Sequence, residues 1–264
     1  MRGGAKASGI KPATDALTPI GDLSSLHLGI VCPMANESAT ALGFVDDVLG
    51  QCAAAGFRAT TFLCVVDSVS RDDTLELLRR HEVDVKQLRV LWAPENTCVV
   101  DAYVHGYEAA LAAGCDWILE IDAGYSHQPA DVPQFFARMK EGYACVFGSR
   151  FCTGGRIIES RSYRRIVSRG GSVLANLLMG TRLTDMTGGF ELFTRAALRH
   201  VLDRGIRSRG PFFQTEIKVH CRDMPVVEVP IQYHAGSHHV GAAALIDAFL
   251  NLGRLLRLRI TRRL

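Results

Sequence analysis

The chain has 264 residues, of which 48% are hydrophobic and 22% are charged, a balance that supports a sizeable core and excludes a disordered protein. The formal net charge of +3 is too small to indicate a nucleic-acid partner. No segment has the roughly 20 consecutive apolar residues of a membrane-spanning helix, and the N-terminus has no apolar signal-peptide core. Eight scattered cysteines without a C-x-x-C pair indicate reduced thiols and a cytoplasmic protein.

The first half of the chain alternates short apolar runs with longer amphipathic ones. A segment rich in Gly, Ala and Pro, 1–24, predicts a flexible leader. Apolar runs then predict strands at 26–34, 60–67, 88–94, 116–122 and 143–151. Helical spacing predicts helices between them, at 39–56, 72–82, 99–114 and 128–142. This alternation predicts an α/β fold, a doubly wound and mostly parallel sheet flanked by helices.

The second half is less regular. The pattern predicts helices at 162–180, 194–205 and 212–223, strands at 190–193 and 225–235, and a last helix from about Ala242. We interpret residues 25–240 as a single domain in which this half elaborates the same sheet.

Polar residues directly follow three predicted strands. They are Pro33 to Glu37, Asp67 and Asp122. Because parallel sheets bind ligands beyond the carboxyl ends of their strands, we expect these residues to share one rim.

Seven motifs occur in a fixed order along the chain. They read CPMANE, VDSVSRDDT, Asn96 to Gly106 with Ala102, EIDAGYSHQP, VFGSRF followed by Gly154-Gly155, SRGGSVLAN and DMTGGFELF. Together they resemble the family 2 glycosyltransferases of the GT-A (Rossmann-like) fold, and within them the polyprenyl-phosphate (dolichol-phosphate-type) sugar transferases. The resemblance implies an inverting transfer of sugar from GDP-mannose or a UDP-sugar to a polyprenyl phosphate, or to a glycan or small-molecule hydroxyl. It also implies a nucleotide-binding half, 25–151, and an acceptor half, 152–240.

The resemblance places the nucleotide-sugar donor at the rim. Asp67 matches the family's acid for the base, which suits uracil and guanine because both present N–H donors. The other donor-binding positions that the resemblance implies are Pro33, Asn36, Glu37, Ser68, Asp122, Ala123 and Gly124. Alternatively, Asp67 and Glu37 are N-caps or first-turn acids, which helices favour in any protein.

Asp122 resembles the first acid of the family's metal-binding Asp-x-Asp, but Gly124 replaces the second acid. One hypothesis is that Asp122, the donor diphosphate and water hold Mg²⁺ or Mn²⁺. A second is that arginines stabilise the diphosphate without metal. A third is a non-catalytic or regulatory nucleotide-sugar binding protein. We favour a working enzyme in which Asp122 is catalytic and binds the metal. His127 is a further candidate ligand, although a single histidine in a turn is more often structural.

Arginines are the candidates for phosphate or acceptor binding. Arg161, Arg165 and Arg169 are spaced i, i+4 and i+8. Like charges at this spacing disfavour a helix unless an anion lies along them. With Arg150, they are predicted to contact donor or lipid phosphate; the alternative is a solvated basic face.

Asp185, in TDMTGG, is the candidate general base for a sugar hydroxyl. A polyprenyl phosphate is already anionic and needs no base, in which case Asp185 orients the acceptor or the donor. The alternative is an Asx-turn before Thr187. Gln214 and Glu216 are predicted to line the sugar pocket, with Glu216 alternatively a surface acid.

Residues 241–264 predict a basic amphipathic helix. Its apolar stripe consists of Leu245, Phe249, Leu252, Leu256 and Ile260, and arginines crowd its end. Such a helix suits an anionic membrane surface, and thus a peripheral protein at the inner face of the membrane. The alternative is a helix packed in the core or in a homo-oligomer.

The chain departs from the family pattern at several places. Ser68, Cys98 and Glu191 replace an Asp, a Gly and an Arg of the pattern, and HAGSHHVG replaces a segment that bears Arg and Lys. These departures concern the acceptor more than the fold, so the donor sugar and the acceptor stay open.

Overall fold

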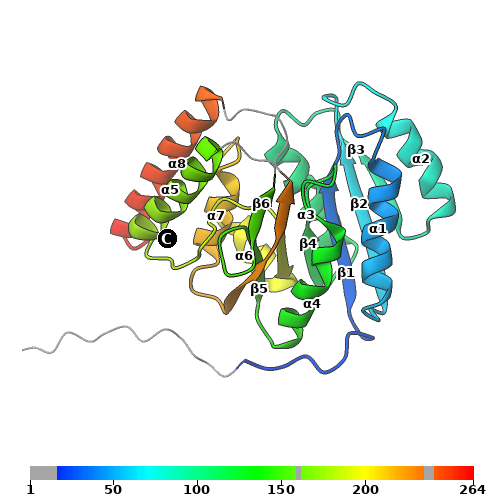
Figure 1. The fold of residues 1–264 in the computed structure, drawn as a ribbon, viewed down its shortest axis with the longest axis horizontal. Coiled ribbons are helices and arrows are strands. Elements are labelled where there is room, and N and C mark those ends of the chain that lie inside the picture. Colours follow the sequence, from blue (N-terminus) through cyan, green and yellow to red (C-terminus); the bar gives the residue numbers. More distant parts are fainter. Residues whose placement is uncertain (1–16, 159–161, 235–240) are drawn as a thin grey trace, which may run out of the picture.

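The computed structural model describes residues 17–158, 162–234 and 241–264. Its centre is a seven-stranded sheet of order β3-β2-β1-β4-β7-β5-β8, in which β7 alone is antiparallel to its neighbours (Figure 1). The strands are β1 (His27–Pro33), β2 (Ala59–Val66), β3 (Leu88–Trp92), β4 (Trp117–Glu120), β5 (Cys145–Ser149), β7 (Glu191–Thr194) and β8 (Val226–Pro230). A second, two-stranded sheet pairs β6 (Arg156–Ile158) with β9 (Gln232–His234).

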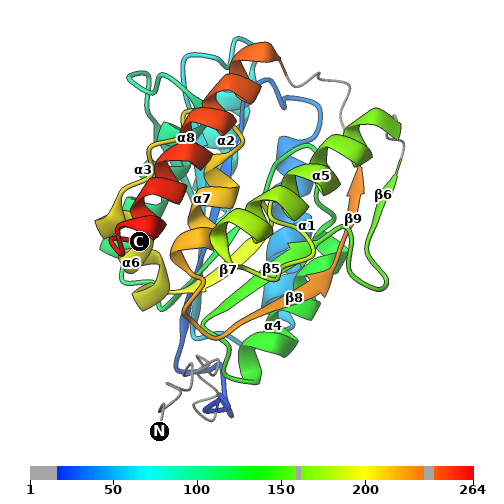
Figure 2. The same cartoon turned by 90° about the vertical axis from the view of Figure 1, so that its left-hand side faces the viewer.

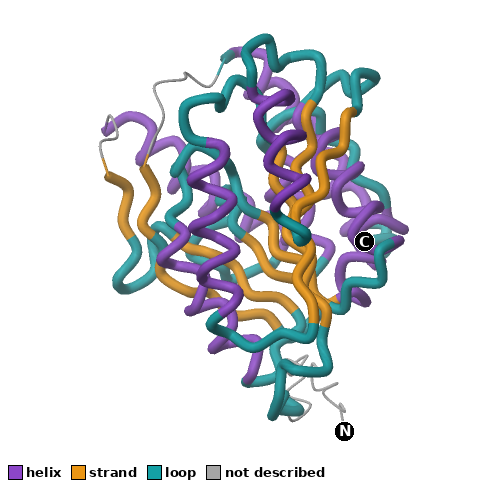
Figure 3. Tube along the Cα trace, turned by 90° about the vertical axis from the view of Figure 1, so that its right-hand side faces the viewer, coloured by secondary structure: helices purple, strands orange, loops and turns teal. Residues whose placement is uncertain are grey.

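Helices cover both faces of the large sheet (Figure 3). They are α1 (Ala41–Ala53), α2 (Thr74–Asp84), α3 (Val99–Ala112), α4 (Val132–Lys140, after the 3₁₀ turn Pro129–Asp131), α5 (Ser162–Met179), α6 (Arg195–Arg204), α7 (Phe213–His220) and α8 (Ala242–Ile260). On one face, α1, α2 and α4 share a core with Ile30 and Cys32 of β1. On the other, α3, α6 and α7 pack against Val31. This alternation of side chains along β1 is the period of two expected of a strand buried on both faces. The predicted doubly wound α/β fold is confirmed.

The loops that follow β2, β1 and β4 lie next to one another. β1 pairs in parallel with β2 on one side and with β4 on the other, with Pro33 opposite Val65 and Val31 opposite Glu120. Because these strands run in one direction, their carboxyl ends meet at one rim. The loops that carry Glu37, Asp67 and Asp122 therefore leave the sheet side by side, as predicted.

The predicted strand 225–235 is two strands in the structure. β8 pairs with β5 in the large sheet, and after Pro230 the chain turns so that β9 pairs with β6. Pro230 has no N–H to donate, and the Ile231 N–H donates to the Ser149 carbonyl (3.1 Å) while its carbonyl accepts from Arg156 (3.0 Å). The strand β6 was not predicted, because a run of three residues has too little pattern.

The predicted leader is too long at its C-terminal end. Residues 1–16 lie outside the described part, but Leu23 is 2% exposed and belongs to the core. The Ile20 N–H donates to the carbonyl of Lys140 at the end of α4 (2.9 Å). Packing on α4 therefore orders the chain before residue 25.

The helices α5 and α8 lie beyond the sheet and approach each other toward their C-terminal ends (Figure 2). Leu252 and Leu255 of α8 form a small core with Ala175 and Met179 of α5. The last helix begins at Ala242, as predicted. In the described ranges, no helix is both long and apolar enough to cross a bilayer.

Candidate active site

A cavity of about 490 Å³ lies between the rim after β4 and the helices α5, α7 and α8. Its polar lining consists of Tyr103, Asp122, His127, Arg150, Ser168, Thr187, Gln214, Thr215 and Tyr233. Its apolar lining includes Leu174 and Ala175 of α5, Phe213 of α7, and Leu245, Ala248, Phe249 and Leu252 of α8. Its charged lining therefore comes from the loops at the sheet, and its hydrocarbon-like lining comes largely from α5 and α8. Of the predicted site residues, the cavity brings together Asp122, Arg150 and Gln214.

Asp122 is positioned by the helix beside its strand. The Tyr103 hydroxyl of α3 donates to Asp122 Oδ1, and the Tyr107 hydroxyl, one turn later, donates to Glu120. One helical turn and two strand residues span similar lengths, about 5–7 Å, so two tyrosines on one helix face match two acids of one strand. The Asp122 side chain is 41% exposed, and its Oδ2 is left to face the cavity.

His127 supports the Asp122 loop from within. Its side chain is 1% exposed and stacks on Phe190 at 4.9 Å between ring centroids. Its Nδ1 accepts the backbone N–H of Asp122 (3.1 Å), which puts the proton of the neutral ring on Nε2. Burial lowers the pKa of His127, so the ring is neutral at pH 7. These contacts support the structural interpretation of His127.

Asp185 is fully buried under Arg150. Arg150 Nε and Nη2 donate to the two carboxylate oxygens (2.7 and 2.8 Å). Burial by itself would raise the pKa of Asp185, but the ion pair with Arg150 holds it at about 2. The Thr187 N–H donates to Oδ1 (3.1 Å), which is the Asx-turn alternative. A carboxylate with both oxygens bound and a pKa this low is a poor base at neutral pH.

These contacts with Asp185 fix the orientation of the Arg150 side chain. Its Nη2 also donates to Thr187 Oγ1 (2.7 Å), and its guanidinium lies 5.3 Å from the ring centroid of Tyr233. Among the described residues, Nη1 has no hydrogen-bond acceptor. An orientated guanidinium at the cavity wall fits the predicted phosphate contact.

The other predicted arginines lie elsewhere. Arg165 and Arg169 of α5 are exposed and do not line the cavity. Arg169 lies 6.0 Å from the ring centroid of Phe151. Arg161 lies outside the described residues.

The loops after β1 and β2 form the neighbouring part of the rim. The Asp67 side chain is nearly buried and accepts the Val69 N–H on Oδ1 (3.0 Å), leaving Oδ2 for a ligand. Asn36 adopts φ of 60° and joins the two loops, because its Oδ1 accepts the Arg71 N–H (2.9 Å). Ser68 is exposed and its hydroxyl donates to the Pro94 carbonyl (3.4 Å). Pro33 is the last residue of β1.

Glu37 and Gly124 are in contact across the rim. A Cβ added to Gly124 would lie 2.8 Å from both carboxylate oxygens of Glu37, and Gly124 has φ of +68°. Ala123 lies between Asp122 and Gly124 in the same turn. In the described part of the chain, no group of three or more His, Cys, Asp or Glu side chains is arranged to hold a metal by itself. Asp122 and Glu37 offer the hard oxygens that Mg²⁺ and Mn²⁺ prefer, and such ions commonly take their other ligands from substrate phosphates and water.

Gln214 closes the floor of the cavity over a buried acidic pair. Its amide Nε2 donates to Glu120 Oε1. Glu120 lies directly opposite Glu191 in the β4–β7 register, and Lys218 of α7 forms an ion pair with Glu191. All three charged side chains have 0–1% exposure.

Glu216 does not line the pocket, which corrects both predictions for it. Its carboxylate is fully buried, accepts the backbone N–H groups of Arg207 (3.0 Å) and Ser208 (2.9 Å), and forms an ion pair with Arg254 of α8. Burial works to raise its pKa, but the neighbouring His220, the backbone hydrogen bonds and the Arg254 cation lower it overall. Glu216 therefore fastens α8 and the loop before α7.

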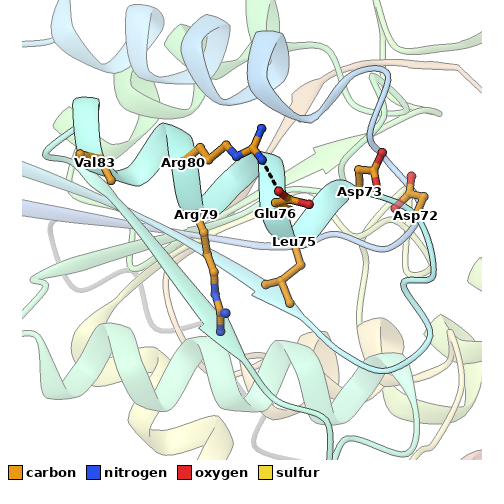
Figure 4. Close-up of a pocket in the computed structure, with 7 residues that line it drawn as sticks. All are labelled: Asp72, Asp73, Leu75, Glu76, Arg79, Arg80 and Val83. Atoms are coloured by element: carbon orange, nitrogen blue, oxygen red, sulfur yellow. Dashed lines mark hydrogen bonds and ion pairs between the residues drawn. The ribbon is translucent and has the colours of Figure 1, made fainter.

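A second hollow, of about 480 Å³, runs along the outer side of α2 (Figure 4). Its lining includes charged helix residues, among them the exposed ion pair of Arg80 and Glu76. It contains none of the predicted site residues, and we assign it no part in the site.

Residues 29–202, more than half of the chain, match the family described as Glycosyl transferase family 2. The chain belongs to this family. The transferase is similar to an undecaprenyl-phosphate mannosyltransferase of Micrococcus luteus, 28% identical over 195 residues that cover 72% of this chain and 80% of the relative. It is also similar to a polyprenol monophosphomannose synthase of Mycolicibacterium smegmatis, 26% identical over 174 residues that cover 65% of this chain and 66% of the relative.

Solved structures show that the transferase has the GT-A fold. Glucosyl-3-phosphoglycerate synthase of Mycobacterium tuberculosis in complex with UDP has a TM-score of 0.62 at 15% identity, over 88% of this chain and 80% of that chain. Its complex with Mn²⁺, UDP and glucosyl-3-phosphoglycerate has a TM-score of 0.57 at 16% identity, over 89% and 77%. At this identity the likeness concerns the fold alone.

Sequence reasoning missed Tyr103 and Tyr233 of the transferase's cavity. Tyr103 lies on the apolar face of its helix, where an aromatic residue predicts core packing. One feature of the sequence could have indicated its pairing with Asp122. The spacing of Tyr103 and Tyr107 on their helix matches the spacing of two acids, Glu120 and Asp122, at the end of the next strand. Tyr233 reaches the cavity through β9, whose separation from β8 the sequence pattern does not reveal.

Proposed function

We propose that the transferase moves a hexose from a nucleotide diphosphate sugar to a polyprenyl phosphate, with Mg²⁺ or Mn²⁺ at Asp122. GDP-mannose is the donor that the two curated relatives suggest, because both are named for mannose transfer to a polyprenol carrier. The neighbours in complex with Mn²⁺ and UDP support a divalent cation at the donor diphosphate. The predicted roles of Asp67 toward the base and of Arg150 toward phosphate are part of this proposal.

The observation that carries the proposal is that the candidate bases near the cavity already have hydrogen-bond partners. Asp185 is bound at both oxygens by Arg150, and Nδ1 of His127 is occupied by a backbone N–H. Neither group can take a proton from a sugar hydroxyl. A phosphate oxygen is already anionic and attacks without a base, so this cavity favours a phosphate acceptor. Asp185 then acts as a positioning residue for Arg150.

The shape of the cavity supports a lipid acceptor. A polyprenyl phosphate has an anionic head and a long hydrocarbon tail. Arg150 lines the cavity from the loop after β5, and apolar side chains of α5 and α8 line it from the helices. The head fits beside Asp122 and Arg150, and the tail fits between the two helices and leaves toward their outer surface.

Charge at the site supports the displacement of a nucleoside diphosphate. Negative charge grows on the leaving diphosphate while the sugar becomes oxocarbenium-like. When bound, the cation neutralises that charge, and preorganised donors such as Arg150 Nη1 add to the effect. The Tyr103 hydrogen bond fixes the carboxylate that holds the cation.

The test is turnover with separate acceptors. Purified protein with GDP-mannose or UDP-glucose is expected to release nucleoside diphosphate with a short polyprenyl phosphate, and not with a free sugar or the corresponding polyprenol. Asp122→Asn is expected to lower kcat/KM by about 100-fold or more, whereas Asp203→Asn, an exposed acid on α6, is expected to leave it unchanged. Transfer to the polyprenol or free sugar would contradict the phosphate acceptor. Donor binding without turnover would instead indicate a nucleotide-sugar binding protein.

A further inference from the structure

We propose that Glu37 supplies the second carboxylate ligand of the cation, in the place where the family pattern has an acid and this chain has Gly124. The cation would then be held between two loops, with Asp122 after β4 and Glu37 after β1. This inference rests on the proposed function, because it concerns the cation that accompanies the donor diphosphate.

The first observation is the space beside Gly124. A Cβ at this position would lie 2.8 Å from Glu37 Oε1, 2.8 Å from Oε2 and 3.1 Å from Cδ. The Glu37 carboxylate therefore occupies the place that a side chain at 124 would need. A side chain at position 124 would clash with the Glu37 carboxylate, so this position requires a glycine.

The second observation is that Glu37 is fixed by its neighbours. Its backbone N–H donates to Thr74 Oγ1 (2.8 Å), and Thr40 Oγ1 donates to Glu37 Oε2 (2.8 Å). Asn36, in a left-handed conformation, is bound to the loop after β2 through Ser70 and Arg71. Among the described residues, no donor reaches Glu37 Oε1. One carboxylate oxygen is held and the other is available.

The third observation is that Asp122 is arranged in the same way. Tyr103 donates to Oδ1. His127 Nδ1 lies 3.7 Å from Oδ2, and that nitrogen accepts from the backbone. In the described part of the chain, neither Asp122 nor Glu37 has a Lys or Arg partner. Two carboxylates at one rim repel each other, and a divalent cation bound between them would remove that repulsion. Magnesium sites commonly use one or two carboxylates with substrate phosphates.

The test is Mn²⁺ binding, measured by electron paramagnetic resonance titration with GDP and with UDP present. The readout is affinity for the ion and does not depend on turnover. Glu37→Gln and Asp122→Asn are each expected to weaken Mn²⁺ binding by tenfold or more. Glu108→Gln, the same change at an exposed position of α3, is expected to leave it unchanged. The melting temperature of each variant without ligand separates lost binding from lost folding.

A double variant tests whether the two positions are interchangeable. Gly124→Asp alone is expected to bind Mn²⁺ more weakly than wild type, because the new side chain clashes with Glu37. Glu37→Gly combined with Gly124→Asp is expected to recover Mn²⁺ binding relative to Glu37→Gly. No recovery, or a Glu37→Gln protein that binds Mn²⁺ as tightly as wild type while Asp122→Asn does not, would overturn the inference and leave the proposed function standing. Failure of the wild type to bind GDP or UDP at all would instead overturn the proposed function.

Discussion

At the scale of single residues, the buried acids beneath the cavity set a pH dependence. Glu120 and Glu191 face each other across β4 and β7 with one cation, Lys218, beside them. Burial raises the pKa of Glu120 well above its usual value, and Glu191 adds to the effect. Burial also raises the pKa of Glu191, to about 7, although Lys218 works in the opposite direction. Near neutral pH the pair therefore retains a proton that the unfolded chain would release.

Replacing Glu120 with Gln is expected to change the slope of stability against pH. A raised acid pKa contributes stability that is complete below pH 4.5 and is lost as pH rises through about 7 and above. The wild type should therefore lose stability relative to Glu120→Gln between pH 5 and 8, by at most about 1.4 kcal/mol per pH unit for one proton. Urea unfolding at several pH values measures the difference.

The difference between wild type and Glu120→Gln reports the titration of the Glu120–Glu191 pair, because Tyr107, Gln214 and the histidines are the same in both proteins. In Glu120→Gln, Glu191 and Lys218 remain as a neutral ion pair. Parallel curves for the two proteins would show that Glu120 is ionised in the folded state.

Individual site residues differed in how well the sequence predicted them. Asp122 and Asp67 follow strands directly, so the parallel sheet alone places them at one rim. Glu216 is a different case, because its neighbour along the helix, Gln214, faces the cavity while Glu216 faces Arg254 of α8. Which face of a short helix meets which partner depends on contacts between residues 38 positions apart, which no local pattern contains.

At the scale of elements, α5 and α8 present an apolar surface outward. The exposed side chains are Ile166, Val173, Leu174 and Leu177 on α5 and Leu245, Ile246, Phe249, Leu250 and Ile260 on α8. Exposed arginines, Arg257, Arg259, Arg262 and Arg263, follow at the C-terminal end of α8. The predicted stripe of α8 is divided, since Leu252 is buried against α5 while Phe249 is exposed. Leu252 therefore supports the packing interpretation, and membrane contact by the exposed residues stays a prediction.

We expect this surface to bind membranes that contain anionic lipid. Ile246→Ser combined with Leu250→Ser removes two exposed apolar side chains one turn apart without touching the cavity lining. Each is worth about 1.5–3 kcal/mol when buried, so vesicle binding in a sedimentation assay should fall by tenfold or more. Val83→Ser, a change at an even more exposed apolar position on α2, serves as the control.

Two other results would contradict membrane binding by this surface. Equal sedimentation of the double variant and wild type would show that α8 does not contact the bilayer. A wild-type dimer in size-exclusion chromatography that the double variant loses would identify the surface as an interface between two copies of the chain.

At the scale of the whole molecule, the donor is expected to stabilise the fold by joining three loops. A ligand that binds only the folded state at 100 times its Kd adds about 2.7 kcal/mol to the free energy of unfolding. At least one UDP- or GDP-sugar should therefore raise the melting temperature, and Asp67→Ala should abolish the rise. Thermal-shift measurements with and without Mg²⁺ or Mn²⁺ make the comparison.

Asp67→Asn and Asp203→Ala are the controls for this prediction. Asp67→Asn keeps an oxygen for the Val69 N–H but loses the charge that faces the base, so it should behave like Asp67→Ala. Asp203→Ala should respond like wild type. A full rise with Asp67→Ala would place the base elsewhere, and a rise without metal would indicate that arginines meet the diphosphate.

The overall sheet was predictable because strand and helix periods alternate clearly up to residue 151. The connections beyond it were not. Arg150 and Asp185 are 35 residues apart, and their contact depends on how the chain returns through β7. The cavity between α5 and α8 likewise depends on how these helices pack. The order of the helices along the chain does not reveal which of them pack together.

The position of β7 has a consequence for synthesis on the ribosome. Residues emerge in chain order, so β4 and β5 are made before the strand that lies between them. Until Thr194 has left the exit tunnel, β4 has an unpaired edge and β5 has no place beside it. β4 and β5 are therefore joined in one sheet only after about half of residues 152–240 has been translated, and a nascent chain stalled at residue 151 is expected to need protection from aggregation.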